Sequence, residues 1–320
     1  MRAAVLTGVR TMSIQEVPEP QITKANQIKV RVLVCGLCAS ETECWTGEKD
    51  SIGRIIGHEP VGIVVDKGAE VTDFEIGDRV AAGFCHFAFA DYVVQDTSLF
   101  AKVPDWLRDE EAIGEPPSCV LGAVQRVPLD FGSRAAVVGC GYMGLMVIRM
   151  LKLRGCASIT AVDSQQPALE NALKYGADEV YTPSELRAEH FVDGFNDRTF
   201  VDGFDAVFEV TGNEQALKMA SRMVKGHGYL EIVGFHTGSR EIDVRLWNMK
   251  GLNVINGHDK RMRMRGKYIR AYMEMVRCKK ADFGDLITNG YALEDIDQGF
   301  SDMVNRAPGY IKGYIRVNEA

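Results

Sequence analysis

The sequence predicts an α/β protein of two domains, one mostly β and one built on a doubly wound parallel sheet. Short strand-like runs broken by Pro, Gly and Asp turns fill the chain up to about Val103. From Ala135 onward, apolar strands alternate with helical segments, which is typical of a parallel sheet covered on both faces. A glycine-rich turn, residues 139–144, joins the first of these strands to a helix.

The first domain is expected to be mostly β, with strands at residues 1–6, 28–35, 61–66, 79–82 and 90–94. A helix from Glu115 to about Arg126 then leads into the second domain. There the expected strands are residues 135–138, 158–162, 179–181, 206–210, 228–233 and 252–256, with one helix directly after the glycine turn and others at 167–175 and 214–223.

The C-terminal tail is irregular for a parallel sheet. It begins with a basic helix that ends near Cys278, followed by a strand at 286–288, a helix at 295–304 and a strand at 311–317. We therefore expect the tail to pack on the first domain. This assigns residues 1–118 with 261–320 to the first domain and residues 119–260 to the second.

Composition limits the class of protein. The net charge of −7, from 37 Lys+Arg against 44 Asp+Glu, argues against a general nucleic-acid surface. No apolar run is long enough for a membrane span or a signal peptide. Eight cysteines are scattered without a paired framework, which favours a reducing compartment. The sequence therefore predicts a cytoplasmic protein.

The glycine turn has the spacing G-x-G-x-x-G between a strand and a helix. In that context Gly139 allows a tight turn, Gly141 lets the backbone approach a pyrophosphate, and Gly144 lets the helix close onto the strand. Tyr142 and Met143 occupy the same turn. Phosphates would lie on the helix N-terminus, so the turn predicts a dinucleotide site.

Asp163 follows the next strand and lies 19 residues beyond Gly144. A carboxylate at this spacing accepts hydrogen bonds from an adenosine ribose and repels a 2′-phosphate, so NAD is predicted over NADP. Thr211, Gly234 and Gly257 follow later strands. They are expected at the carboxyl edge of the sheet, where ligands bind, and are candidate cofactor contacts.

Cys38, His58 and Glu59 are candidate zinc ligands in the first domain. A catalytic zinc takes three such protein ligands and leaves one position for water or substrate. Cys35 forms C-x-x-C with Cys38, but no second C-x-x-C would complete a four-cysteine site. Residues 35 and 38 of a strand also point to opposite faces, so Cys35 is expected in the core. The alternative for Cys38 and His58 is a buried thiol and a hydrogen-bonded imidazole.

Motifs along nearly the whole chain resemble those of the zinc-dependent medium-chain alcohol and polyol dehydrogenases, the sorbitol and threonine dehydrogenase type. They are Gly36-Leu-Cys-Ala-Ser-Glu41, Gly57-His-Glu-Pro60, Gly77-Asp-Arg-Val80, Phe89-Ala-Asp-Tyr-Val93, Glu115-Pro, the glycine turn, Ile287-Thr-Asn and Leu293-Glu-Asp-Ile. The resemblance implies a GroES-like catalytic domain and a Rossmann cofactor domain.

The resemblance also implies the ligands and the reaction. Cys38 and His58 would bind the catalytic zinc together with a carboxylate, either Glu59 or Glu115. Zinc would act as a Lewis acid that lowers the pKa of the alcohol, and hydride would pass to the nicotinamide. Ser40 matches the hydroxyl that takes the alcohol proton.

Three departures from the family pattern bear on the site. Glu41 replaces an Asp that orients the zinc histidine. Glu43 stands where several relatives place a relay histidine, so the proton exit either uses this carboxylate or follows a different route. Only eight residues separate Val80 from Phe89, where the family often carries a structural-zinc lobe. One catalytic zinc and no structural zinc are therefore expected.

Several alternatives stay open at this point. A basic stretch is either an anion clamp or a solvated helix face: Lys260, Arg261, Arg263, Arg265, Lys267 and Arg270. Cys85 and His86 either face the substrate or serve packing and surface. Substrate contacts are expected from Trp45, Phe84, His86 and Cys119.

The predicted function is a zinc- and NAD-dependent dehydrogenase acting on a secondary alcohol such as a polyol, sugar or amino alcohol. It is expected to bind a small alcohol or ketone, and neither nucleic acid nor a membrane. The resemblance implies a homodimer or homotetramer. One alternative is a zinc-free NAD(P)H quinone or enone reductase of the same superfamily. Another is a non-catalytic NAD-binding or structural protein.

Overall fold

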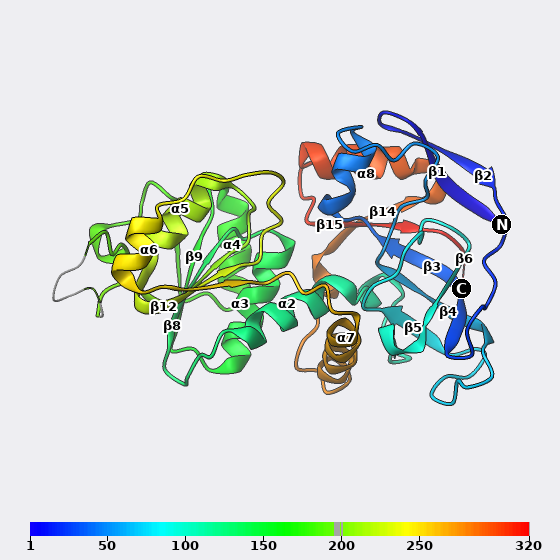
Figure 1. Ribbon diagram of the computed structural model, residues 1–320, viewed down its shortest axis with the longest axis horizontal. Coiled ribbons are helices and arrows are strands. Elements are labelled where there is room, and N and C mark those ends of the chain that lie inside the picture. The colour runs from blue at the N-terminus through cyan, green and yellow to red at the C-terminus, as the bar shows by residue number, and fades with distance from the viewer. Residues whose placement is uncertain (195–198, 200, 320) are drawn as a thin grey trace. The chain divides into compact units, whose positions relative to one another are not determined.

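The computed structural model describes residues 1–194, 199 and 201–319, and the chain forms two compact units (Figure 1). The first unit comprises Met1–Ser118 and Arg261–Ala320, and the second comprises Cys119–Lys260. Helix α2, Glu115–Arg126, begins in the first unit and continues into the second. No helix within the described ranges is both long and apolar enough to cross a membrane.

A seven-stranded sheet forms the first unit, in the order β14-β15-β3-β4-β5-β7 with β6 also paired to β3. Its strands are β3 Gln27–Gly36, β4 Pro60–Lys67, β5 Arg79–Ala82, β6 Tyr92–Asp96, β7 Phe100–Lys102, β14 Ile287–Ala292 and β15 Lys312–Arg316. A separate hairpin is made by β1, Arg2–Gly8, and β2, Thr11–Glu16. The mostly β prediction is confirmed.

The C-terminal tail joins this sheet, as expected from its irregular pattern. Strand β15 pairs antiparallel with β3 and places Ile315 opposite Cys35. Figure 1 shows the red end of the chain beside the blue strand β3. Cys35 is fully buried in the core of this unit, which agrees with its assignment to packing.

The first unit also contains the helices α1 Thr42–Trp45, α7 Met262–Arg277 and α8 Ile296–Asn305, of which α1 was not predicted from the sequence. On α7, Tyr268, Ile269 and Tyr272 are buried, whereas most basic side chains of the stretch are exposed. Most of the basic stretch is therefore a solvated helix face, which was one of the two alternatives left open by the sequence. Arg265 is the exception, because it is buried.

The second unit is a doubly wound parallel sheet, as predicted. Its strand order is β10-β9-β8-β11-β12-β13. The strands are β8 Arg134–Val138, β9 Ser158–Val162, β10 Glu179–Tyr181, β11 Phe204–Glu209, β12 Val224–Ile232 and β13 Asn253–Asn256. The helices are α3 Tyr142–Arg154, α4 Gln166–Tyr175, α5 Glu214–Met223 and α6 Val244–Lys250, besides α2. The strand order reverses beside β8, which is where such sheets bind ligands.

Candidate functional site

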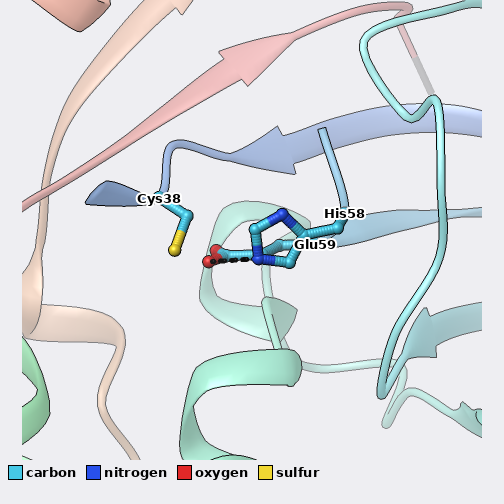
Figure 2. Close-up of side chains that lie close together, drawn as sticks. All are labelled: Cys38, His58 and Glu59. Carbon is cyan, nitrogen blue, oxygen red and sulfur yellow. Dashed lines mark ion pairs between the residues drawn. The ribbon is translucent and has the colours of Figure 1, made fainter. Parts of the chain in front are cut away.

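Cys38, His58 and Glu59 come together where β3 ends and β4 begins. The two strands pair antiparallel with Cys35 opposite Pro60, so the residues after β3 lie beside those before β4. The Cys38 thiol, the His58 imidazole and the Glu59 carboxylate each offer one ligand atom, and these atoms all lie within 4.8 Å of one another. Figure 2 shows the three side chains directed toward one another.

The Glu59 carboxylate is buried and only half satisfied. Its Oε2 forms an ion pair with the Lys312 ammonium at 2.6 Å, and Lys312 also donates to the Leu37 carbonyl at 2.7 Å. No hydrogen-bond donor among the described residues reaches Oε1, which lies 3.9 Å from His58 Nε2. Burial raises the pKa of the Glu59 carboxyl, although Lys312 opposes the shift. A buried oxygen without a donor is expected where a cation binds.

The close fit of Glu59 depends on Gly36. A Cβ at that position would lie 2.0 Å from Glu59 Oε2, so a side chain at residue 36 would displace the carboxylate. Glycine at the end of β3 thus makes room for the carboxylate.

His58 is oriented by Glu41. Nδ1 lies 2.9 Å from Glu41 Oε1, which also accepts a hydrogen bond from the Gly57 N–H at 2.6 Å. This contact directs Nε2 toward Cys38 and Glu59, as second-shell carboxylates do for ligand histidines. Burial alone would lower the pKa of His58, but the Glu41 carboxylate and the Cys38 sulfur together hold it well above its usual value.

Glu115 lies outside the three-residue cluster and has its own cation. It is the first residue of α2, and its Oε1 accepts a hydrogen bond from Arg265 Nη1 at 2.9 Å. Both side chains are 8% exposed. Arg265 also lies over the Phe84 ring, 4.5 Å from its centroid.

The residues present suit a divalent cation. Sulfur, imidazole nitrogen and carboxylate oxygen are the donor set that zinc prefers in catalytic sites. With Cys38 as thiolate and His58 neutral, as metal ligands are, Cys38 and the glutamates Glu41, Glu59 and Glu115 carry four negative charges, whereas the neighbouring buried cations Lys312 and Arg265 carry two. A divalent ion would supply the remaining two positive charges.

The other candidate residues of the first unit differ in their exposure and in the side chains that they contact. Ser40 is exposed, and its hydroxyl donates to Cys38 Sγ at 3.2 Å. Glu43 is partly buried in α1. Phe84 lies 5.8 Å from the His58 ring and 4.7 Å from the His86 ring, between centroids. The expectation that Trp45 contacts substrate is wrong, because its side chain is buried against Phe300 in the core.

The glycine turn lies at the carboxyl end of β8 in the second unit. Gly139 has a φ of +100°, which favours glycine. A Cβ on Gly144 would lie 1.9 Å from the Gly139 carbonyl oxygen, so only glycine lets α3 start this close to the strand. Gly141 is the N-cap of α3, with Tyr142 and Met143 in the first turn. The helix N-terminus therefore has the form of an anion site.

Asp163 directly follows β9 and lies beside this turn. Its two oxygens accept hydrogen bonds from the Cys140 N–H at 2.7 Å and the Gln165 N–H at 2.9 Å. These bonds hold the carboxylate beside the glycine turn, where an adenosine ribose would be recognised.

A further polar cluster at the carboxyl edge was not foreseen. Glu209 accepts hydrogen bonds from the Thr211 N–H at 2.7 Å and the Gly212 N–H at 3.0 Å, and its Oε2 lies 2.8 Å from His236 Nε2. Arg240 Nε donates to His236 Nδ1 at 3.1 Å. The cluster fixes the turn after β11. Its sequence signal is weak, because Glu209 and His236 are 27 residues apart.

The other two edge glycines lie close to this region. Gly234 approaches Gly212, since a Cβ on Gly234 would lie 2.2 Å from the Gly212 nitrogen. Gly257 follows β13 and donates its N–H to the Ile232 carbonyl at 2.8 Å. These residues belong to the turns that end β11, β12 and β13.

Comparison with known proteins adds to this geometry. Residues 24–105 match the family described as "Alcohol dehydrogenase GroES-like domain", and residues 143–275 match "Zinc-binding dehydrogenase". The chain is 30% identical to sorbitol dehydrogenase of Bacillus subtilis (strain 168), covering 92% of this chain and 91% of that protein. It is 28% identical to (R,R)-butanediol dehydrogenase of the same strain, over 99% and 100%.

Solved structures show the same architecture. The crystal structure of 2R,3R-butanediol dehydrogenase from Bacillus subtilis superposes with a TM-score of 0.78 at 26% identity, covering 99% of each chain. The similarity thus extends over both units and includes the stretches that carry the cysteine, the histidine and the glycine turn.

Proposed function

The chain belongs to the zinc-dependent medium-chain alcohol dehydrogenase family, and on that premise we propose that it transfers a hydride between a secondary alcohol and NAD. The relatives are named for sorbitol and butanediol, so a polyol, sugar or amino alcohol is the proposed substrate class. The observation that carries the proposal is the cluster of Cys38, His58 and Glu59, with a buried carboxylate oxygen that has no donor.

We propose that Cys38, His58 and Glu59 hold a single zinc ion, with Glu41 orienting His58. A zinc ion bound there acts as a Lewis acid on the substrate hydroxyl, and bound NAD accepts the hydride. No second group of metal-binding side chains occurs among the residues that the structure describes. One catalytic zinc and no structural zinc is therefore the proposed stoichiometry.

The chain's own residues would handle the proton. Ser40 is exposed beside Cys38, so its hydroxyl can accept the alcohol proton and pass it to solvent or to the cofactor ribose. Glu43 lies on α1 directly after the Ser40 turn, which makes its carboxylate the proposed next acceptor.

Cofactor binding is proposed for the glycine turn and the edge residues. Gly139, Gly141, Tyr142, Met143 and Gly144 would cradle the pyrophosphate, and Asp163 the adenosine ribose. Thr211, Gly234 and Gly257 would contact the cofactor at the carboxyl edge of β11 to β13.

Asp163→Ser tests the preference for NAD. Removing the carboxylate removes its repulsion of a 2′-phosphate, so the ratio of kcat/KM for NAD to that for NADP should fall by an order of magnitude or more, equivalent to about 1.4 kcal/mol. Asp178→Ser, at the opposite end of the same sheet, should leave the ratio unchanged. An unaltered ratio in Asp163→Ser would contradict the ribose assignment.

The central experiment combines metal analysis with Cys38→Ser. The wild-type protein should hold about one zinc per chain and reduce NAD with a panel of polyols. Cys38→Ser should lose the zinc and the turnover while keeping NAD affinity, and Cys278→Ser, at an exposed cysteine, should keep all three. Absence of zinc would favour the zinc-free reductase. Zinc and NAD binding without turnover on any alcohol would favour the non-catalytic protein.

We also propose a homodimer or homotetramer built through the second unit. Strand β13 is the edge of its sheet, and it exposes Val254 at 38%. Val244 and Met249 of the neighbouring α6 are also exposed. Unpaired edge strands with apolar side chains are sites of association. A mass of 35.4 kDa by sedimentation would contradict this proposal. The cytoplasmic location stays a prediction.

A further inference from the structure

We propose that Arg265 is a positioning residue that keeps Glu115 away from the metal, so that zinc retains three protein ligands and an open position. This inference rests on the proposed metal site. Of the two candidate carboxylates, Glu59 would therefore bind the ion, whereas Glu115 is held by the Arg265 guanidinium.

The pairing of Glu115 with Arg265 is buried and direct. Arg265 Nη1 lies 2.9 Å from Glu115 Oε1, and each side chain is 8% exposed. A charge-assisted hydrogen bond of this kind is roughly twice as strong as a neutral one, and removing one partner leaves a buried charge without compensation. If Glu115 turned toward another cation, this hydrogen bond would break and the buried guanidinium would lose its carboxylate partner.

Arg265 itself is held in place by the packing of α7. Its guanidinium lies over the Phe84 ring, and its carbonyl oxygen would lie 3.0 Å from a Cβ on Gly83. One turn further along α7, Ile269 Cδ1 would lie 2.3 Å from a Cβ on Gly114. The glycines that precede Phe84 and Glu115 thus let the helix approach closely, and this close approach brings Arg265 to Glu115.

Glu115 is near the cluster without belonging to it. Burial raises the pKa of the Glu59 carboxyl, and the charge of Glu115 adds to this shift, so the two carboxylates interact electrostatically. However, the group whose ligand atoms lie within 4.8 Å of one another contains Cys38, His58 and Glu59 only, within the described part of the chain. Each carboxylate has a separate buried cation, Lys312 for Glu59 and Arg265 for Glu115.

The arrangement has a chemical consequence. A fourth protein ligand would close the tetrahedral zinc site, whereas a catalytic site needs one position for substrate or water. Without Arg265, the buried Glu115 carboxylate would lose the guanidinium that compensates its charge, and a zinc ion in the neighbouring cluster would attract it. Arg265 would then preserve the open position rather than take part in the reaction.

The test compares Arg265→Met, Arg265→Lys, Glu115→Gln and the double variant Arg265→Met/Glu115→Gln. Two readouts are used: the rate at which a chelator extracts zinc, and the visible d–d absorption of the cobalt(II)-substituted protein. Arg265→Met should slow zinc extraction and change the cobalt spectrum, because Glu115 would occupy the open fourth position. Arg265→Lys, Glu115→Gln and the double variant should behave like the wild type.

The outcomes separate the inference from the function on which it rests. Faster zinc loss in Glu115→Gln would show that Glu115 is already a ligand and would overturn the inference, and so would an unchanged Arg265→Met protein. The double variant removes both charges and leaves no uncompensated buried ion, so faster zinc loss from it would overturn the inference even if neither single variant folds. A wild-type protein that binds neither zinc nor cobalt would refute the proposed metal site itself.

Discussion

Lys312→Met should strongly destabilise the first unit of the metal-free protein. Lys312 is 5% exposed, and its ammonium forms an ion pair with the buried Glu59 carboxylate at 2.6 Å. Methionine keeps most of the side-chain volume but removes the charge and the hydrogen bond to the Leu37 carbonyl. The variant would therefore isolate the electrostatic role of Lys312.

The size of the effect follows from the protonation of Glu59 when Lys312 no longer compensates its charge. A lone buried carboxylate takes up a proton, and at pH 7 this costs up to about 4 kcal/mol relative to an unfolded carboxyl with a pKa near 4.3. The wild type bears part of this cost, because burial raises the pKa of Glu59 there as well. That figure agrees with the ~3–5 kcal/mol lost when one partner of a buried ion pair is removed. Since the folded pKa of Glu59 in the variant lies above its unfolded value, the loss is greatest at neutral pH and shrinks to about 1 kcal/mol at pH 5.

The assay is urea unfolding after removal of metal by a chelator, followed at pH 7 and pH 5. With a slope of about 2–3 kcal/mol per molar urea, the midpoint of the first unit should fall by roughly 1.5 M at pH 7. Lys152→Met is the matched control, because its ion pair with Asp178 is about 40% exposed on each side and should contribute under about 1 kcal/mol. A pH-independent loss, or one no larger than that of Lys152→Met, would refute the reasoning.

Two further predictions concern buried charges of the second unit. Glu231, in β12, has neither carboxylate oxygen hydrogen-bonded in the described chain, and burial raises its pKa to about 8. Glu231→Gln should therefore match the wild type below about pH 4.5 and gain stability over it by about 1.4 kcal/mol per pH unit up to pH 8; parallel pH–stability curves would contradict this. Lys250 donates to the carbonyls of Ser221, Arg222 and Val224, at the end of α5. Lys250→Met should cost about 2–3 kcal/mol in urea unfolding, whereas Lys218→Met, at an exposed pair, should cost little; equal losses would argue against the capping role.

Local patterns predicted most of the fold. The glycine turn, the strand before it and the aspartate after β9 carry their signal within 30 residues, and the structure has each where the pattern indicated. Short or weakly patterned elements, namely β2, β7 and α6, were not foreseen. Strand β12 also begins at Val224, earlier than expected, because the glycines at 226 and 228 lower its β propensity without preventing its pairing with β11.

The partners of the candidate site could not be predicted in the same way. Cys38, His58 and Glu59 stand in recognisable local motifs, but Lys312 reaches the site from β15, 275 residues away from Leu37 in the chain. Arg265 lies 150 residues from Glu115 and appeared only as one member of a basic stretch. Nothing in the local sequence distinguishes this arginine from its solvated neighbours, because its burial results from the packing of α7 on distant glycines.

The split composition of the first unit has a consequence for synthesis. Residues 119–260 are contiguous, so the second unit can fold as soon as it leaves the ribosome. The β sheet beside Cys38 and His58 lacks β14 and β15 until residues 287–316 emerge, and Glu59 can pair with Lys312 only after that. A nascent chain therefore carries an unfinished first unit while the whole second unit is being made, and the lysine that compensates Glu59 arrives after the second unit.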